Sequence, residues 1–320
     1  MLRKILNLIL ESEKIALFHH INPDGDTLSS SYGLALALKK RFPSKEIKVV
    51  GNYEELSSNL PFSNIKSALF TEEIDENWLA IVGDTSNLER IEKKEMFLKA
   101  GKTACFDHHT TEPNYKFNAF WSEPNWIAST LQALEIVKKL KIELDEEIAY
   151  HLMIGIITDS GQFSFSLADP RPVKAYAYLL EYIENKTMDS FFYEFKKKEV
   201  KDLEIEAFIL NQIKFSDSCV FLKVTNQNLK ELGIDKKQIK AKVNKLGNIE
   251  GFNVWALFIE VLTETQVYIK GSLRSNGPNV ARVAEKYGGG GHVRAAGLIA
   301  QDWKEVDKII SNLNSISNIY

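Results

Sequence analysis

The stretch Thr103-Ala104-Cys105-Phe106-Asp107-His108-His109 sets an apolar run directly before one carboxylate and two imidazoles. Placing such groups beside a core costs free energy unless a partner compensates them, and a divalent metal ion is one such partner. A short apolar run between helical patterns is typical of a buried strand. The stretch therefore predicts a strand whose carboxyl end carries candidate metal ligands.

Two other apolar runs end in residues of the same kind. Ile15–Phe18 precedes His20 and the stretch Pro23-Asp24-Gly25-Asp26, and Leu79–Val82 precedes Asp84. In an open α/β sheet, ligands bind beyond the carboxyl ends of the strands. We therefore expect acids and imidazoles from three strands to meet at one edge of a sheet.

A fourth contributor is Asp159, which follows the predicted helix Glu146–Ile157. The negative end of a helix dipole disfavours a carboxylate unless a cation lies nearby. Each segment alone has a simpler explanation: Asp24-Gly25 is typical of a turn, and Asp84 could cap a helix. Four segments with the same chemistry favour a shared site.

Apolar runs that alternate with helical patterns predict an α/β protein, with an N-terminal, mostly parallel sheet flanked by helices and a second, smaller α/β domain. We expect the first domain over residues 1–190, a linker helix over 191–212 and the second domain over 213–320. Helices are predicted over Ser29–Phe42 (capped by Ser29 or Ser30), Leu88–Ala100, Ile127–Leu140, Glu146–Ile157, Pro172–Ile183, Asn228–Leu246, Asn279–Tyr287 and Trp303–Leu313.

The ligand set combines oxygen and nitrogen donors without thiolate. Carboxylates suit magnesium or manganese and imidazole suits later first-row metals, so manganese is the best match. More than four ligands argue against a closed structural zinc site and are compatible with two ions about 3.5–4 Å apart.

The composition limits the kinds of partner that this chain is expected to bind. The chain has 320 residues, 26% of them charged, and a net charge of −3, which argues against coating long duplex nucleic acid. Its two cysteines, Cys105 and Cys219, both lie in apolar runs and imply no disulfide framework. The apolar N-terminus, Met1–Leu10, is too short to span a bilayer. We predict a cytoplasmic protein that does not bind membranes.

Four consecutive glycines, Gly288 to Gly291, precede His292 in the predicted second domain. They lie between a predicted helix and the apolar run Ala295–Ala300, which favours a backbone cradle for an anion over a flexible linker. Arg274 and His292 would complete a clamp for phosphate or carboxylate.

Together these residues resemble the DHH superfamily of phosphoesterases, which includes the RecJ nucleases. The matching motifs are His20-Ile21-Asn22-Pro23-Asp24-Gly25-Asp26, Asp84, Asp107-His108-His109, Asp159-Ser160-Gly161, Arg274-Ser275, and Gly288–His292 followed by Ala295-Ala296-Gly297. The last two resemble the DHH-associated substrate domain. The compact size is most similar to the NrnA-like subgroup of manganese-dependent nano-RNases that also dephosphorylate pAp.

The resemblance implies a division of labour. His20 and Asp24 would hold one ion, and Asp84 would bridge it to the second. Asp107 would orient His108, and His109 would lie near the scissile phosphate. The second ion would be held by Asp26, His108 and Asp159, and substrate would be bound by Arg274, Ser275, Gly289, Gly290, Gly291 and His292.

The function expected from this resemblance is hydrolysis of short oligoribonucleotides to mononucleotides and of pAp to AMP, with two manganese ions that magnesium or cobalt could replace. Hydrolysis of c-di-AMP or its linear product pApA is the alternative. Pyrophosphate or polyphosphate hydrolysis and a non-catalytic nucleotide sensor are more distant alternatives. A homodimer is compatible with the sequence, and processive digestion of long strands is disfavoured because the chain lacks strand-threading additions.

Overall fold

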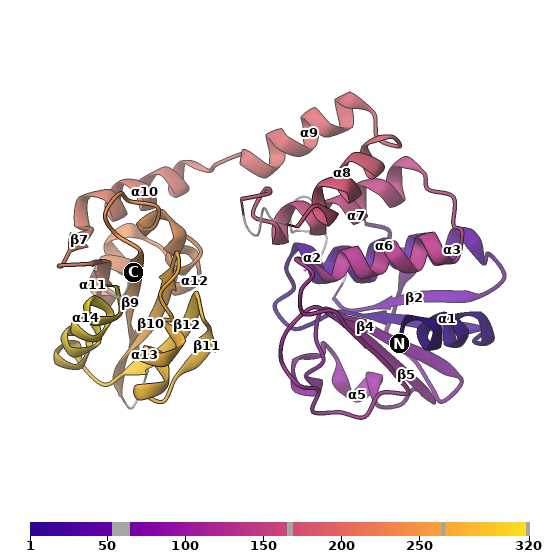
Figure 1. The fold of residues 1–320 in the computed structure, drawn as a ribbon, viewed down its shortest axis with the longest axis horizontal. Helices are drawn as coiled ribbons and strands as arrows, with labels where there is room; N and C mark the ends of the chain where they lie inside the picture. Colours follow the sequence, from indigo (N-terminus) through magenta and orange to yellow (C-terminus); the bar gives the residue numbers. More distant parts are fainter. Residues whose placement is uncertain (53–64, 165–168, 264–265, 318–320) are drawn as a thin grey trace. The chain divides into compact units, whose positions relative to one another are not determined.

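The computed structural model describes residues 1–52, 65–164, 169–263 and 266–317. The chain divides into two compact units, Met1–Lys197 and Lys198–Tyr320 (Figure 1). The division falls between two helices, α9 (Asn185–Lys196) and α10 (Val200–Gln212). The charge-dense stretch expected to link the domains therefore contributes to one helix in each unit.

The first unit is built on a six-stranded sheet of order β3-β2-β1-β4-β5-β6 in which every pair is parallel. This confirms the predicted α/β class and parallel sheet. The strands are β1 (Lys14–Phe18), β2 (Glu46–Val50), β3 (Phe70–Thr71), β4 (Trp78–Gly83), β5 (Lys102–Asp107) and β6 (Ala119–Ser122).

Both faces of this sheet are covered. Ile15 and Leu17 of β1 join one apolar cluster with helices of the first unit, whereas Ala16 and Phe18 join another that includes Phe97. The helical segments are α1 (Leu2–Glu11), α2 (Gly25–Leu28), the π-turn η1 (Ser29–Gly33), α3 (Leu34–Arg41), η2 (Ser67–Leu69), η3 (Leu88–Arg90), α5 (Lys94–Phe97), α6 (Ser129–Lys139), α7 (Glu146–Asp159), α8 (Arg171–Leu180) and α9.

The register of the central strands brings their carboxyl ends together. Phe18 of β1 lies opposite Val82 of β4, and Gly83 lies opposite Phe106 of β5. Because the strands are parallel, the residues that follow them emerge at the same edge. His20, Asp84 and the Asp107–His109 stretch therefore start from neighbouring positions.

The predicted helix over 88–100 is wrong. The segment contains only the short turns η3 and α5, with Lys93 between them in the left-handed region at φ 50°. Its backbone is bonded elsewhere: Ile21 N–H donates to Arg90 O at 2.8 Å and Glu92 N–H donates to His19 O at 2.9 Å. The segment thus fixes the backbone on either side of His20.

Two other helix boundaries differ from expectation. The helix predicted from Ser29 begins at Gly25, because Asp24 caps it by accepting from the backbone N–H groups of Asp26 and Thr27. In the second unit, the helix predicted over 228–246 is interrupted at Gly233, which adopts φ 63°. It consists of α11 (Asn226–Leu232), α12 (Lys236–Lys240) and the 3₁₀ turn η4 (Val243–Leu246).

The second unit has a mixed six-stranded sheet of order β11-β12-β10-β9-β8-β7. One face packs on α13 (Ala281–Lys286) and α14 (Trp303–Ser317), and the other packs on α10, α11, α12 and η4. The strands are β7 (Lys214–Phe215), β8 (Cys219–Val224), β9 (Val254–Leu262), β10 (Val267–Ser275), β11 (Gly290–His292) and β12 (Ala295–Ala300).

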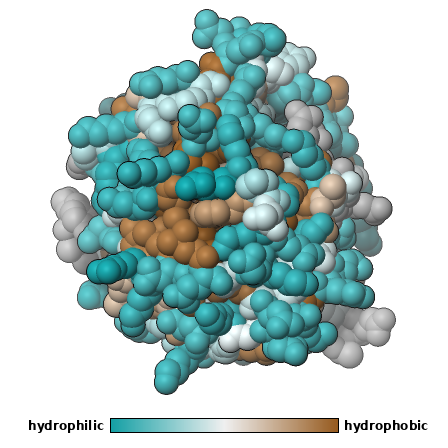
Figure 2. All heavy atoms as spheres, turned by 90° about the vertical axis from the view of Figure 1, so that its right-hand side faces the viewer, coloured by the Kyte–Doolittle hydropathy of each residue, from teal (hydrophilic) through white to brown (hydrophobic). Residues whose placement is uncertain are grey.

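Among the described residues, no helix combines the length and apolar character needed to cross a bilayer. The face of the molecule drawn in Figure 2 is mostly hydrophilic and carries one apolar depression near its centre.

Candidate metal centre

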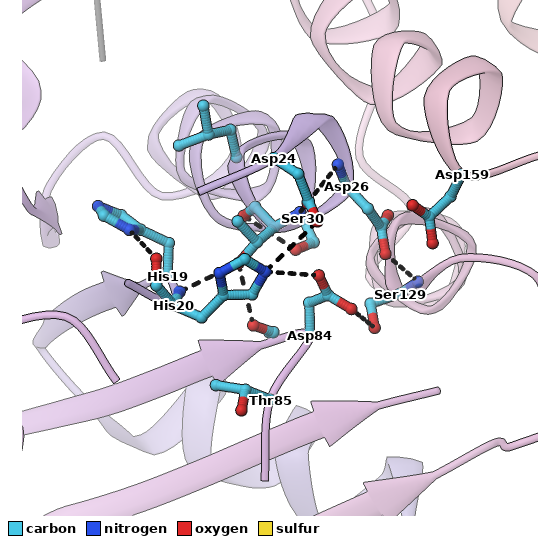
Figure 3. A network of polar contacts seen from close by, with 12 residues as sticks. His19, His20, Asp24, Asp26, Ser30, Asp84, Thr85, Ser129 and Asp159 are labelled. Carbon is cyan, nitrogen blue, oxygen red and sulfur yellow. Dashed lines mark hydrogen bonds and ion pairs between the residues drawn. The ribbon is translucent and has the colours of Figure 1, made fainter. Parts of the chain in front are cut away.

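His20 is positioned by the segment after β1. Its side chain is 3% exposed, and its ring Nε2 lies 3.5 Å from Asp24 Oδ2 and 3.4 Å from Asp84 Oδ2. The opposite ring nitrogen, Nδ1, contacts Ile21 O at 3.0 Å. This contact orients Nε2 toward the two carboxylates (Figure 3).

Asp26 anchors the start of α6 to the site. Its fully buried carboxylate accepts hydrogen bonds from the backbone N–H groups of Ser129 at 2.7 Å and Thr130 at 2.8 Å. A carboxylate at a helix N-terminus satisfies free N–H groups and complements the helix dipole. Asp24 remains more exposed and uses one oxygen to cap α2.

Asp84 lies at the centre of the site and is 2% exposed. It adopts φ 67°, an unusual conformation for a residue other than glycine, which Asp tolerates better than most. Its Oδ2 faces His20, while its Oδ1 lies 3.2 Å from His108 Nε2 and accepts from Ser129 Oγ at 3.2 Å. The two oxygens of Asp84 therefore face two different sets of candidate ligands.

The Asp107-His108-His109 stretch is arranged differently from the expectation. Asp107 Oδ1 lies 2.8 Å from His109 Nδ1 and accepts from the His109 backbone N–H at 3.0 Å, so Asp107 orients His109 rather than His108. His108 Nδ1 instead contacts Trp126 O at 3.1 Å. A backbone carbonyl that fixes the ring of a ligating His is a common supporting contact.

Asp159, the last residue of α7, also belongs to the site. Its Oδ2 lies 3.4 Å from His108 Nε2, and Asp26 Oδ2 lies 3.9 Å from the same nitrogen. Gly25 permits this approach: a Cβ there would meet Thr158 Oγ1 at 2.3 Å. The close contact of α2 and α7 thus brings Asp26 and Asp159 to one imidazole.

These contacts strongly shift the pKa values of the side chains in the site. Burial lowers the pKa of His20 and His108, but hydrogen bonds and charge interactions with neighbouring carboxylates, among them Asp84, outweigh it and raise both to about 10. Burial and repulsion from Asp84 raise the pKa of Asp159 to about 7, and burial and neighbouring carboxylates raise that of Asp26 well above its usual value. A divalent cation would supply the positive charge that protons otherwise provide.

The residues therefore fit a metal site. Within the described part of the chain, three groups of side chains could hold an ion, each with ligand atoms within 4.8 Å of one another. The groups share Asp84 and His108, which connect them into one centre. They are His20, Asp24 and Asp84; Asp26, His108 and Asp159; and Asp84, His108 and His109.

The second-unit residues do not all behave as the sequence suggests. A Cβ at Gly289 would meet Gly297 O at 2.2 Å and one at Gly291 would meet Ala295 O at 2.5 Å, so these two glycines permit close pairing with β12. Gly288 and Gly290 have open space where a Cβ would lie. The Ser275 hydroxyl donates to Pro278 O at 2.5 Å and closes its own turn.

Arg274 and His292 share one face of the second sheet. Arg274 lies opposite Ala295 in the antiparallel register, and Ala295 lies opposite His292. Directly opposed residues in a sheet project to the same face. The clamp expected from the sequence thus has its members on one surface.

Ser129, Thr130 and Trp126 are supporting residues that sequence reasoning missed. Ser129 and Thr130 begin α6 and bind Asp26 through their backbones, and the Trp126 carbonyl holds His108. The pair Ser129-Thr130 before an apolar helical run was the available signal, because such residues favour helix starts.

Comparisons with known proteins identify the family of this chain. Residues 14–156 match the model of the DHH family, N-terminal domain, and residues 217–318 match that of the DHHA1 domain. The chain is 33% identical over 313 residues to the bifunctional oligoribonuclease and PAP phosphatase NrnA of Mycoplasma genitalium, covering 96% of this chain and 95% of that protein. It therefore belongs to the DHH family, within its NrnA-like branch.

One further relative and one solved structure are also similar to this chain. NrnA of Bacillus subtilis is 28% identical over 98% of this chain and 97% of that protein. The crystal structure of an exopolyphosphatase-related protein from Bacteroides fragilis has the same fold, with a TM-score of 0.82 at 20% identity, covering 98% of this chain and 95% of that one.

Proposed function

We propose that this protein is a metal-dependent phosphoesterase that hydrolyses short oligoribonucleotides to mononucleotides and removes the 3′-phosphate of pAp. The observation that carries the proposal is the position of Asp84, whose two oxygens face His20 and His108 and so connect the candidate ligand groups. The names of the relatives, oligoribonuclease and PAP phosphatase, support the substrate class.

We assign two manganese ions to the centre, with magnesium or cobalt as substitutes. His20 and Asp24 would hold one ion, with Asp84 shared between both. The second ion would be held by Asp26, His108 and Asp159. When bound, two such ions make a water nucleophilic near neutral pH and neutralise charge on the phosphoryl oxygens.

The chain's own residues would position the substrate and stabilise charge. Asp107 contacts Nδ1 of the His109 ring, and His109 would lie near the scissile phosphoryl group. The buried Asp107 carboxylate fixes the orientation of this ring, so His109 would help to stabilise the negative charge that develops on a phosphoryl oxygen. Arg274, Ser275, Gly289, Gly290, Gly291 and His292 would contribute to the binding of the remote part of the substrate, with Ser275 shaping the turn rather than touching it.

The test is a substrate panel. Purified protein with manganese is incubated with pAp, a diribonucleotide, a long RNA, c-di-AMP, pApA and pyrophosphate, and kcat/KM is compared. We expect the diribonucleotide and pAp to give the highest values. A preference for c-di-AMP or pApA would select the cyclic-dinucleotide alternative, and exclusive hydrolysis of pyrophosphate would reject the proposal.

We further infer a cytoplasmic location and a homodimer as the working assembly. The two cysteines, Cys105 and Cys219, are buried and unpaired, which fits a reducing compartment. Cell fractionation and light scattering of the purified protein test these two points.

A further inference from the structure

A cavity of about 610 Å³ opens on the second unit beside the Gly288–His292 segment. One wall is α12, and the floor is formed by β9, β10 and β12. Its lining residues are Lys236, Lys237, Lys240, Ile259, Val261, Lys270, Gly271, Ser272, Gly288, Gly289, Gly297, Leu298 and Ile299.

The cavity concentrates positive charge. Lys236, Lys237 and Lys240 of α12 face it together with Lys270 of β10, and none of the described residues that line it is Asp or Glu. In the described ranges, none of these four lysines has a carboxylate within 4.0 Å. This arrangement is unusual in a chain whose net charge is −3.

Nearby lysines on the same unit show the usual arrangement. Lys242 lies 2.6 Å from Asp202 Oδ1, and Lys245 lies 3.3 Å from Glu206 Oε1. Clustered like charges repel one another, so four lysines around one cavity, with no acidic partner among the described residues, favour an anionic ligand.

The cavity is continuous with the expected clamp. Lys270, Ser272 and Arg274 alternate along β10 and therefore project to one face of the sheet. Their partners on β12 are Ile299, Gly297 and Ala295, and β11 extends the same face through Gly290 and His292. Lys270 and Arg274 are four residues apart along the strand, about 13 Å.

The length and composition of this surface identify its ligand. A separation of about 13 Å exceeds one phosphate group and suits a short run of nucleotides. Lysines act as point charges for phosphates, and the exposed apolar side chain of Ile299 offers a surface for a base or sugar. Lys270, Ser272 and Arg274 would follow the backbone between the two ends.

We propose that this lysine-lined cavity binds the phosphodiester backbone of substrate nucleotides remote from the scissile bond, and so strengthens binding of RNAs longer than two nucleotides. The proposal rests on the proposed function, since it assigns part of the same substrate. It predicts that removing the lysines selectively weakens the binding of longer substrates.

The binding test uses the whole protein in EDTA with a fluorescein-labelled pentaribonucleotide and measures anisotropy. The variant Lys236→Gln/Lys237→Gln/Lys240→Gln should raise Kd at least tenfold. Three lost phosphate contacts should also reduce the slope of log Kd against log salt by about 2, at about 0.7 for each contact with a single strand.

The matched control removes the same charge from the opposite face of the sheet. Lys286 of α13 and Lys304 and Lys308 of α14 are exposed, and the variant Lys286→Gln/Lys304→Gln/Lys308→Gln should change Kd less than twofold. Equal weakening by both variants would show a general charge effect and overturn the proposal.

Kinetics with manganese provide the second arm. The cavity variant should lower kcat/KM for the pentaribonucleotide about tenfold and leave the diribonucleotide and pAp within twofold. Equal loss on all three substrates, or no loss on any, would overturn the proposal. So would displacement of the pentaribonucleotide by AMP or inorganic phosphate at equal concentration, which would assign the cavity to a free phosphate compound.

The two proposals fail differently. If the wild-type protein hydrolyses none of these substrates, the proposed function is wrong, and the binding arm in EDTA still decides whether the cavity holds RNA. If hydrolysis occurs and the lysine variant binds the pentaribonucleotide normally, only the cavity proposal is wrong.

Discussion

The two units of this chain differ in how far their functional polar residues are buried. In the first unit, Asp26, Asp84 and Asp107 are at most 2% exposed, and each is bonded to a backbone N–H, a hydroxyl or an imidazole. In the second unit, the polar residues of interest line an open sheet face, and Lys236 and Lys270 have no acidic partner within the described ranges. The first arrangement fixes geometry, and the second provides charge.

This difference sets the expected response to substitution. A buried, mutually bonded network loses function when one member changes, because the remaining groups stay buried without their partner. An open charged surface loses affinity gradually, one phosphate contact at a time. Variants of the first unit should therefore affect turnover strongly, as the following predictions test.

Asp84→Asn should have the largest effect. It keeps the side-chain shape and a residue type that tolerates the left-handed backbone, but removes the charge that faces both ligand groups. Losing several kcal/mol of transition-state stabilisation should lower kcat by about three orders of magnitude or more. Calorimetric titration should show that manganese binding is lost, while circular dichroism remains unchanged.

The control for this variant is Asp189→Asn, an exposed residue of α9 whose substitution should leave kcat unchanged. Retention of more than a tenth of the wild-type kcat in Asp84→Asn would contradict a central role for this carboxylate.

Gly25→Ala should have a smaller but substantial effect. The added Cβ would overlap Thr158 Oγ1 at 2.3 Å and separate α2 from α7, which carry Asp26 and Asp159. A displacement of about 1 Å at a catalytic site can cost about 10²-fold in rate. Steady-state assays with saturating manganese measure it.

Adding Thr158→Ala to Gly25→Ala should recover part of the lost activity, since two of the three overlapping atoms disappear. If the double variant is no more active than Gly25→Ala, separation of the two helices is not the cause of the loss.

Arg171→Ala should affect the site indirectly. Its guanidinium lies 5.0 Å from the centre of the Trp126 ring and donates to Asn125 O at 2.8 Å, and the Trp126 carbonyl orients His108. Loss of a supporting contact of this kind costs about 10- to 100-fold in metal affinity. The lower end is expected here, because Arg171 acts through a loop.

The readout for Arg171→Ala is the manganese concentration that gives half-maximal activity, which should rise about tenfold while kcat at saturation changes little. Lys174 lies one turn further along α8 and is exposed, and its side chain has no hydrogen bond or ion pair with this loop in the described part of the chain, so Lys174→Ala should behave as wild type. An unchanged manganese requirement in Arg171→Ala would show that the contacts of Arg171 with this loop do not support metal binding.

The strand ends of the first unit were predictable because each apolar run is followed at once by acids or histidines. The segment over 88–100 was not, because its apolar spacing suits a helix while its backbone instead bonds to residues 19–21. The orientation of Asp107 also escaped prediction, since adjacency in sequence does not say which of two neighbouring imidazoles a carboxylate contacts.

In the second unit, the glycine run predicted an unusual backbone conformation but not its structural role. Gly289 and Gly291 are required for close pairing with β12, a contact between segments that only the folded register reveals. The cavity lysines could not be grouped from the sequence, because Lys236 and Lys270 line one cavity only after α12 packs against the sheet.

A buried histidine outside the metal centre gives the smallest effect and sharpens the comparison within the first unit. His151 of α7 is 1% exposed, with its ring 4.8 Å from that of Tyr32. Burial lowers its pKa from 6.5 to about 3. Between these two values, the unfolded chain binds a proton at this residue that the folded chain does not, so stability falls as pH falls below 6.5.

The expected slope is about 1.4 kcal/mol of unfolding free energy per pH unit from this one group. Urea unfolding in EDTA at pH 7.5, 6.5 and 5.0 should show that the wild type loses about 2 kcal/mol more than His151→Phe, because other groups titrate alike in both proteins. Activity of the variant at pH 7.5 should stay within twofold of wild type. Parallel pH dependences would mean that the folded protein accepts the proton at His151, and a large loss of activity would tie this residue to the metal centre after all.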